Sequence, residues 1–409
     1  MKRNYTIFLF FIITLTNFAT DSLNVRSISH TLNDTTCFAV KDVYVQGDYA
    51  YCACDRDGLI ILDVSDLTHP AEVGRLDTPG FAEAVRVRDT LAFVADWNGG
   101  LRIIDISNPA IPTEIGTTQV HEPALFITLR EDYAYVGTRG AGVKIVDITD
   151  PRYPSVLYIP SFDFNQIVRS IIEYGDHEIV SGNPDPGETI RIVDMSDPWS
   201  ISVFEEIGYE KIIYCSAKVD SFILLGVFNG IDIYRNTLAT WYFEHEVLYE
   251  TCTEGSWVKD MAVNGTYLFT ASSYNGIRVY DVSNPASSLP EIGYYDTESR
   301  ANAVFIVDSL AYVADMESGL YILDISSLPD AVAEQNLPTT SDIRIYPNPF
   351  NATCNISWSG RIEIFDISGR LIDELNAPCT WKPDEKTASG VYLIKVKGGE
   401  ECKKLVLLR

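Results

Sequence analysis

The sequence contains few histidines and lacks the motifs that mark common hydrolases. Five histidines occur in 409 residues, and they are scattered without the spacing of metal ligands. There is no His-Glu-x-x-His zinc motif, no Gly-x-Ser-x-Gly nucleophile turn and no phosphate-binding loop. No residue is therefore nominated as catalytic by motif alone.

Positive charge is also scarce. The chain has 31 lysines and arginines against 57 aspartates and glutamates, which gives a formal net charge of −26 at pH 7. A surface this acidic repels nucleic-acid phosphates and anionic lipid headgroups. We expect no nucleic-acid partner. With 46% apolar residues and 11% aromatic residues, the chain can nevertheless bury a substantial core.

Long apolar runs are absent except at the N-terminus. Lys2 and Arg3 precede an apolar run over residues 5–15, and the small residue Ala19 follows. The run is short for a membrane span and is typical of a secretory signal peptide. We predict a signal peptide over residues 1–20 and export of the rest in soluble form. Export permits disulfides, but the pairing of eight cysteines cannot be read from sequence.

A short apolar phrase recurs along the chain about every 42 residues. Its terminal aspartates at 63, 105 and 147 have this spacing, and a glycine-containing turn joins each copy to a preceding apolar segment. The segments are short, rich in Val, Ile and Tyr, and bounded by Gly and Pro, which favours β-strands. The copies occupy residues 59–63, 101–105, 143–147, 190–194, 231–234, 277–281 and 320–324.

About four strands in 42 residues is the size of one blade of a β-propeller. The sequence thus predicts an all-β, seven-bladed β-propeller over residues 24–330. The seventh repeat lacks its last strand, whereas residues 28–32 form an unassigned strand-like segment before the first repeat. We predict that this N-terminal strand completes the seventh blade. The fifth repeat, which reads Tyr234-Arg235 where the other copies end in aspartate, has the least certain boundaries.

The recurring phrase resembles the LVIVD repeat, which occurs in surface proteins of bacteria and archaea with propeller-like repeats. The resemblance covers roughly residues 28–330, and six of the seven copies keep the terminal aspartate. It implies a propeller at the cell surface.

A different pattern follows a linker predicted over residues 331–341. Residues 343–351 read Ile-Arg-Ile-Tyr-Pro-Asn-Pro-Phe-Asn, and residues 362–370 and 388–396 carry further strand and turn motifs in order. These motifs resemble the type A sorting domain of the type IX secretion system. Strand-like alternation independently predicts a small β-sandwich over residues 342–409. The resemblance implies recognition by outer-membrane secretion machinery and delivery to the extracellular space or outer surface of a Gram-negative-type bacterium.

The aspartates that end the repeated phrase allow two interpretations. They accept backbone N–H groups in the following turn, or they form a ring of cation ligands. Recurrence in nearly every repeat favours the structural role. These structural repeat aspartates are Asp63, Asp105, Asp147, Asp194, Asp281 and Asp324.

One position breaks the symmetry of the repeats. In the turn after the second strand it is acidic only in repeats two and seven, which flank repeat one in a closed ring. The resulting candidate cluster suits Ca²⁺, a sugar or a cationic group, while the alternative is a solvated acidic turn. Its members are Asp55, Asp57, Asp96, Trp97, Asp315 and Glu317.

Three functions remain open from the sequence. The first is a non-catalytic binding or scaffold protein at the cell surface, whose ligand is an unidentified surface glycan or protein. The second is a secreted hydrolase or lyase with carboxylates at the channel mouth, for which Asp57, Asp96 and Asp315 are the nominees. The third is a structural surface-layer component.

Overall fold

The regular elements of the chain, in a computed structural model, are all β-strands within the residues that the structure describes. None of these residues lies in a helix that could cross a membrane. The chain divides into two compact units, Met1–Ala331 and Val332–Arg409, and each is described by itself. The predicted signal peptide (1–20) and linker (331–341) lie outside the described residues. The described residues are 22–32, 37–157, 166–174, 177–184, 188–209, 211–236, 241–248, 256–328, 344–346, 354–366, 370–383, 387, 390–396 and 402–407.

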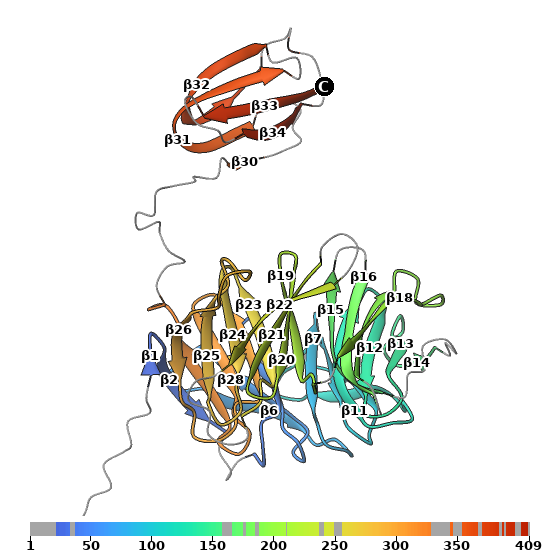
Figure 1. The fold of residues 1–409 in the computed structure, drawn as a ribbon. Helices are drawn as coiled ribbons and strands as arrows, with labels where there is room; N and C mark the ends of the chain where they lie inside the picture. Colours follow the sequence, from blue (N-terminus) through green and yellow to red (C-terminus); the bar gives the residue numbers. More distant parts are fainter. Residues whose placement is uncertain are drawn as a thin grey trace, which may run out of the picture. The chain divides into compact units, whose positions relative to one another are not determined.

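The first unit consists of antiparallel sheets, most of them with four strands (Figure 1). In the sheets formed by one repeat each, consecutive strands are neighbours. These sheets are β3–β6 (Asp42–Gln46, Tyr49–Ala53, Leu59–Asp63, Ala71–Leu76), β7–β10 (Ala84–Arg88, Leu91–Ala95, Leu101–Asp105, Thr113–Thr118), β11–β14 (Ala124–Arg130, Tyr133–Thr138, Val143–Asp147, Ser155–Val156), β15–β18 (Gln166–Tyr174, His177–Pro184, Glu188–Asp194, Ser202–Tyr209) and β19–β22 (Cys215–Val219, Phe222–Val227, Gly230–Asn236, Trp241–Leu248).

Two further sheets receive strands from the N-terminus. Strands β23–β26 (Asp260–Asn264, Tyr267–Ala271, Ile277–Asp281, Glu291–Tyr295) gain β1 (Ser22–Leu23), and β27–β29 (Ala303–Val307, Leu310–Ala314, Leu320–Asp324) gain β2 (Arg26–Thr31). The pairing of β2 with β29 confirms that the N-terminal segment completes the last repeat. The two blue strands accordingly lie beside the orange ones in Figure 1. The additional pairing of β1 with β26 was not predicted.

The register of β2 reproduces that of the fourth strand in other sheets. The ladder between β9 and β10 skips Ile115, and the ladder between β5 and β6 skips Val73. The ladder between β2 and β29 skips Ile28 in the same place, between Ser27 and Ser29. A β-bulge at a fixed position is a built feature of a strand. Strand β2 therefore takes the place of the missing fourth strand, with its irregularity included.

The sheets follow one another in a closed cycle. The first strand of each sheet contacts the first strand of the next, and β27 contacts β3. Backbone hydrogen bonds join the ends of this cycle, because Val40 N donates to Met316 O at 2.9 Å and Met316 N donates to Val40 O at 3.1 Å. Such a cyclic arrangement of small antiparallel sheets is a β-propeller.

The hydrophobic core lies between neighbouring sheets. One cluster combines Val43 and Ile60 with Tyr312 and Ile322, which belong to the first and last sheets of the cycle. The third strand of several sheets is buried along nearly its whole length, as in β5 and β9. A strand covered on both faces reads as a continuous apolar run. This explains why the repeated phrase is apolar at successive positions before its aspartate.

Glycine is required in the turn that precedes this phrase. Gly100 has a φ of +78° and Gly319 a φ of +90°. A Cβ on Gly100 would lie 2.3 Å from Thr118 O, and one on Gly319 would lie 2.2 Å from Thr31 O. The turn therefore requires both the left-handed conformation and the absence of a side chain.

The second unit contains one five-stranded antiparallel sheet. Its strands are β30 (Arg344–Tyr346), β31 (Cys354–Asp366), β32 (Leu371–Trp381), β33 (Gly390–Val396) and β34 (Cys402–Leu407). The long strand β31 pairs with β30, β32 and β33. Trp381, Ile362 and Ile394 are buried in this unit.

Removal of the closing strand tests the cycle. We expect full-length protein lacking residues 24–36 to melt lower by on the order of 10 °C, because β29 and its core contacts lose their cover. Thermal unfolding followed by circular dichroism measures this. The control is a chain lacking residues 342–409, which should keep the melting temperature of the first unit. Equal melting temperatures in the chain without residues 24–36 and in the intact chain would refute the closing role.

Candidate functional site

The six repeat aspartates occupy equivalent turns. Each accepts a hydrogen bond through Oδ1 from the backbone N–H two residues later, with donor–acceptor distances of 2.8–3.0 Å. This is the geometry of an Asx-turn. The pairs are Asp63 with Ser65, Asp105 with Ser107, Asp147 with Thr149, Asp194 with Ser196, Asp281 with Ser283, and Asp324 with Ser326.

These bonds favour the ionised carboxylate. Hydrogen bonds from Ser65 lower the pKa of Asp63, and those from Ser107 lower the pKa of Asp105. The carboxylates therefore contribute to the turn after the third strand of each sheet. They are distributed around the propeller rather than gathered at one site.

Asp96 and Asp315, two members of the candidate cluster, are fully buried. Thr78 Oγ1 donates to Asp96 Oδ1 at 2.5 Å, and Gly80 N donates to Asp96 Oδ2 at 2.9 Å. Asp315 repeats the arrangement, since it accepts Thr297 Oγ1 at 2.5 Å and a backbone N–H at 2.8 Å. Each carboxylate thus fastens the segment entering its sheet to the turn after the second strand.

The other members of the cluster lie in the same set of turns, with polar partners of their own. Asp57 Oδ2 accepts the N–H of Phe38 at 2.7 Å. Asp55 Oδ2 lies 3.2 Å from Lys41 Nζ, and Glu317 Oε1 lies 2.5 Å from Arg300 Nη2. Within the described part of the chain, no three His, Cys, Asp or Glu side chains come together as a metal site. The calcium hypothesis stays a prediction, for which calorimetric titration with Ca²⁺ is the direct measurement.

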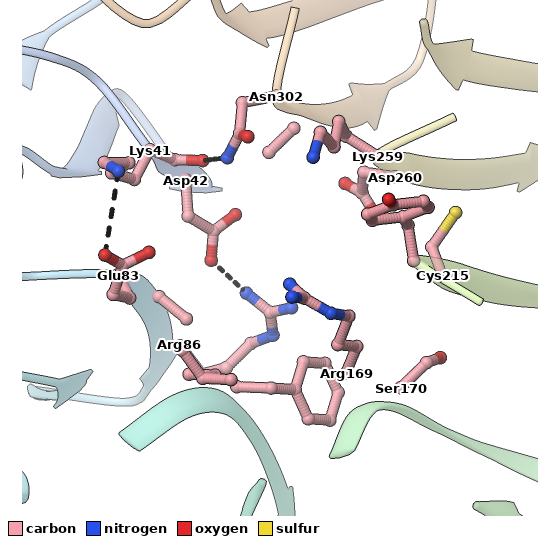
Figure 2. Close-up of a pocket in the computed structure, with 15 residues that line it drawn as sticks. Lys41, Asp42, Glu83, Arg86, Arg169, Ser170, Cys215, Lys259, Asp260 and Asn302 are labelled. Atoms are coloured by element: carbon pink, nitrogen blue, oxygen red, sulfur yellow. Dashed lines mark hydrogen bonds and ion pairs between the residues drawn. The ribbon is translucent and has the colours of Figure 1, made fainter. Parts of the chain in front are cut away.

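Trp97, the remaining member of the candidate cluster, lies at a different site. It lines a cavity of about 430 Å³ where the first strands of the sheets converge. A second cavity of about 150 Å³ adjoins it, because the two share Lys41, Glu83, Arg169 and Lys259. Figure 2 shows these four residues around the second cavity. We call the larger cavity the channel mouth and the smaller one the inner channel.

The channel mouth is rich in positive charge although the chain as a whole is acidic. Five of its six charged lining residues are basic. They come from different sheets or from the segments that lead into them. The six are Lys41, Glu83, Arg139, Arg169, Lys259 and Arg300.

Acidic partners neutralise only part of this charge. Lys41 Nζ lies 3.2 Å from Asp55 and 3.6 Å from Glu83, and Arg300 pairs with Glu317. Arg139, Arg169 and Lys259 form no ion pair with any residue that the structure describes. Three cations at the mouth therefore have no ion-pair partner among the described residues, although Glu83 acts on Arg169 at longer range.

Aromatic rings hold these three cations. Lys259 Nζ lies 4.3 Å from the ring centre of Tyr214 and 5.0 Å from that of Trp257. The Arg169 guanidinium lies 5.5 Å from the Tyr214 ring, and Arg139 lies 5.5 Å from Trp97. A cation–π contact fixes a cation in place without cancelling its charge.

The pKa of Lys259 reflects this crowding of positive charge. Burial, followed by the charge of Arg169, lowers the pKa of Lys259 to about 8. Arg169 Nε is buried and has no hydrogen-bond partner in the described part of the chain. Both side chains therefore make an unfavourable contribution to the stability of the folded protein.

Acidic groups lie in the inner channel. Asp42 accepts the N–H of Val85 at 3.0 Å and pairs with Arg86 at 2.7 Å (Figure 2). Asp260 accepts the N–H of Val304 at 3.0 Å, and burial raises its pKa to about 6. Each carboxylate thereby joins its own sheet to the next.

The sequence interpretation missed the basic residues of the mouth. Lys41 and Lys259 occupy the same position, because the backbone N–H of each donates to the last residue of the neighbouring second strand, Ala53 and Ala271. An alignment of the residue just before the first strand of each repeat would have revealed Lys41 and Lys259 as lining the mouth. Arg139 and Arg300 stand at other positions of their repeats, and Arg169 lies within β15. Of the cluster predicted from the turn after the second strand, only Trp97 lines the mouth.

Comparison with known families identifies two kinds of segment. The family model of the LVIVD repeat matches residues 39–78, 79–120, 124–159, 255–297 and 300–330. The model described as the secretion system C-terminal sorting domain matches residues 344–408. Sheets β15–β18 and β19–β22 fall between the LVIVD matches, yet they have the same strand order as their neighbours. No curated protein matches the chain in sequence.

Several solved structures are similar in fold. The β-propeller domain of Cps50 (Swd1) from Myceliophteria thermophila is 13% identical with a TM-score of 0.56, covering 73% of this chain and 99% of that one. The computationally designed protein Ika8 is 10% identical with a TM-score of 0.53, covering 73% and 100%. PorZ, described as an essential bacterial surface component of the type-IX secretion system of Porphyromonas gingivalis, is 14% identical with a TM-score of 0.51. That match covers 91% of this chain and 60% of PorZ. At these identities the likeness concerns the fold alone.

The buried carboxyl of Asp315 predicts a pH dependence of stability. Burial raises the pKa of Asp315 to about 7, whereas an aspartate in an unfolded chain titrates near 3.9. Between these values the folded chain holds a proton that the unfolded chain has lost, so this group makes stability fall as pH rises. We expect Asp315→Asn to remove a loss of up to about 4 kcal/mol over that window.

Urea unfolding of the full chain between pH 4.5 and 7.5 measures this difference in slope. Asp105→Asn is the matched control, because the pKa of Asp105 is lowered and its titration falls below the window. An Asp315→Asn protein with the same slope as the parent would contradict the assignment.

Proposed function

Because the chain carries LVIVD repeats and a C-terminal secretion sorting domain, we propose that it is an exported, cell-surface β-propeller that binds a partner without catalysis. The observation that carries this proposal is the joining of a propeller to a sorting domain in one chain. The sorting domain implies export to the cell surface or secretion. The propeller then supplies the part of the protein that acts outside the cell.

The proposal includes a propeller of seven blades. Seven sets of strands, six of them contiguous repeats and one completed by β2, support this number. The proposal also includes a β-sandwich for the second unit, supported by the alternation of buried and exposed residues in β31 and β33. Cleavage of the predicted signal peptide precedes recognition of residues 342–409 by the outer-membrane machinery in this scheme.

Binding is favoured over catalysis by the state of the nominated carboxylates. Asp96 and Asp315 are fully buried and accept hydrogen bonds within the fold. A general acid or base must reach the proton that it transfers. Buried carboxylates that fasten one sheet to the preceding segment are suited to holding a rigid ring. A rigid ring presents the channel mouth as a preformed surface.

A hydrolase remains the second candidate because of Asp260. A carboxyl with a pKa of about 6, lining the inner channel together with Asp42, has the character of a general acid. Product release from acidic and neutral polysaccharides by the full chain, lost in Asp260→Asn, would establish this candidate. We expect no product with either protein.

The sorting role is tested by removal of the tail. In the native host, we expect a chain lacking residues 342–409 to accumulate inside the cell, because the signal for the outer-membrane step is gone. Surface labelling and fractionation measure where the protein lies. A chain with Asp105→Asn serves as the control for a change that leaves the sorting domain intact. Unchanged surface delivery of the truncated chain would refute the role.

The binding role is tested on arrays of glycans and peptides probed with the full chain. We expect retention of a restricted set of surface glycans or peptides, and no retention of nucleic acid at physiological salt. A chain lacking residues 24–36 is the control, because it should lose the closed ring. Absence of any retained ligand would favour the surface-layer alternative, for which self-association at high concentration is the direct measurement.

A further inference from the structure

We propose that the channel mouth binds an oxyanion group, a carboxylate, sulfate or phosphate, on a unit of about monosaccharide size, with Arg169 and Lys259 as its main contacts. The inference rests on the proposed binding function and names the chemistry of the ligand. It is drawn from three properties of the mouth: uncompensated charge, an unpaired buried donor and the size of the cavity.

The charge balance among the described residues of the mouth favours an anion, although Glu83 offsets part of the charge of Arg169. Lys41 and Arg300 have carboxylate partners, whereas Arg139, Arg169 and Lys259 have none among the described residues. An arginine stays charged at any ordinary pH, so Arg169 cannot reduce the repulsion by losing its proton. A bound anion would offset the repulsion between these cations.

The way the cations are held also favours an external partner. Tyr214 lies beneath both Lys259 and Arg169, and Trp257 adds a second ring to Lys259. Aromatic faces position the two side chains while leaving their N–H groups available. Arg169 Nε in particular is buried and has no partner in the described part of the chain. Buried donors are normally satisfied, and a bound acceptor at the mouth would satisfy this one.

The dimensions of the mouth limit the ligand. A cavity of about 430 Å³ falls within the range of pockets for small ligands, about 300–1,000 Å³. The inner channel is smaller, at about 150 Å³, and holds Asp42 and Asp260. The two cavities share Arg169 and Lys259, whereas the carboxylates of Asp42 and Asp260 line only the inner channel. This arrangement places the anionic group at the level of Arg169 and Lys259.

The test is calorimetric titration of the full chain at constant ionic strength with sodium sulfate, sodium phosphate and sodium glucuronate. We expect saturable binding of at least one of these anions. Arg169→Gln and Lys259→Met should each weaken it by about tenfold or more, as expected when a charged hydrogen-bond partner is removed. Glu83→Gln should strengthen binding, because it removes the one acidic side chain among the described residues that line the mouth.

Arg75→Gln is the matched control. It changes the net charge by the same amount but removes an arginine that pairs with Glu72 on β6, outside both cavities. We expect its affinity to equal that of the parent. Melting temperatures of all variants separate lost binding from lost folding, and Arg169→Gln and Lys259→Met provide two independent substitutions. Equal weakening by Arg75→Gln, or saturable binding unaffected by both mouth substitutions, would overturn the proposal.

The pH dependence supplies a second readout. Burial has the largest effect on the pKa of Lys259. Smaller electrostatic effects come from Arg169, Cys215, Arg300 and Lys41. Lys259 loses its proton near pH 8, so we expect affinity to fall between pH 7 and 9 in the parent. The fall should be absent in Lys259→Met. The same pH dependence in the parent and in Lys259→Met would overturn the assignment of Lys259.

The source of the oxyanion is distinguished by comparing free anions with an acidic glycan. Tighter binding of polygalacturonate than of glucuronate would assign the mouth to a chain of acidic sugars. Preference for phosphate or sulfate would support the oxyanion site but overturn the unit of monosaccharide size. Failure of all anions would overturn this inference. Retention of a neutral glycan or peptide on the arrays, unaffected by Arg169→Gln, would then leave the proposed binding function standing.

Discussion

The fold depends on one constraint: a sheet that is apolar on both faces must be covered on both sides. Strands such as β5 and β9 are buried along almost their whole length, which one sheet alone cannot achieve. Each sheet is therefore stable only between two neighbours, and the first and last sheets must cover one another. The first and last sheets meet this requirement by packing in one core cluster, and strand β2 completes the last sheet by pairing with β29. Closure with a strand from the other end of the unit makes the ring a single cooperative structure.

The same constraint explains why most polar residues of the repeat are engaged within the fold. The repeat aspartates cap the turn after the third strand, while Asp96 and Asp315 hold the segment that enters their sheets. The inner carboxylates Asp42 and Asp260 bond to the next sheet along. Polar groups that recur around the ring are thus used for cohesion between sheets. Residues with a specific function are therefore expected at positions where the repeats differ.

Much of the fold was readable from the sequence because its signals are local and repeated. The spacing of the phrase predicted the sheets, and the strand-like segment before the first repeat predicted the closing strand. The bulge at Ile28, which matches the one at Val73, emerged only from the structure. The pairing of β1 was not predicted, since two residues carry no periodic pattern. The site was harder to predict. Asp96 and Asp315 looked exposed because they are acidic, although a threonine 18 residues earlier in both repeats was a sign of a buried partner.

The basic residues of the mouth lie close together only because the sheets form a closed ring. Arg169 and Lys259 stand in different repeats, and Tyr214 from the repeat between them holds both. The overall charge of −26 acts against such a site at long range, but salt screens exposed charges beyond about 8 Å. A nucleic acid needs cations spread along an open surface, and here they gather in one hollow. A cationic hollow in an acidic protein is therefore suited to a single anionic group, whereas a nucleic acid would require a continuous cationic surface.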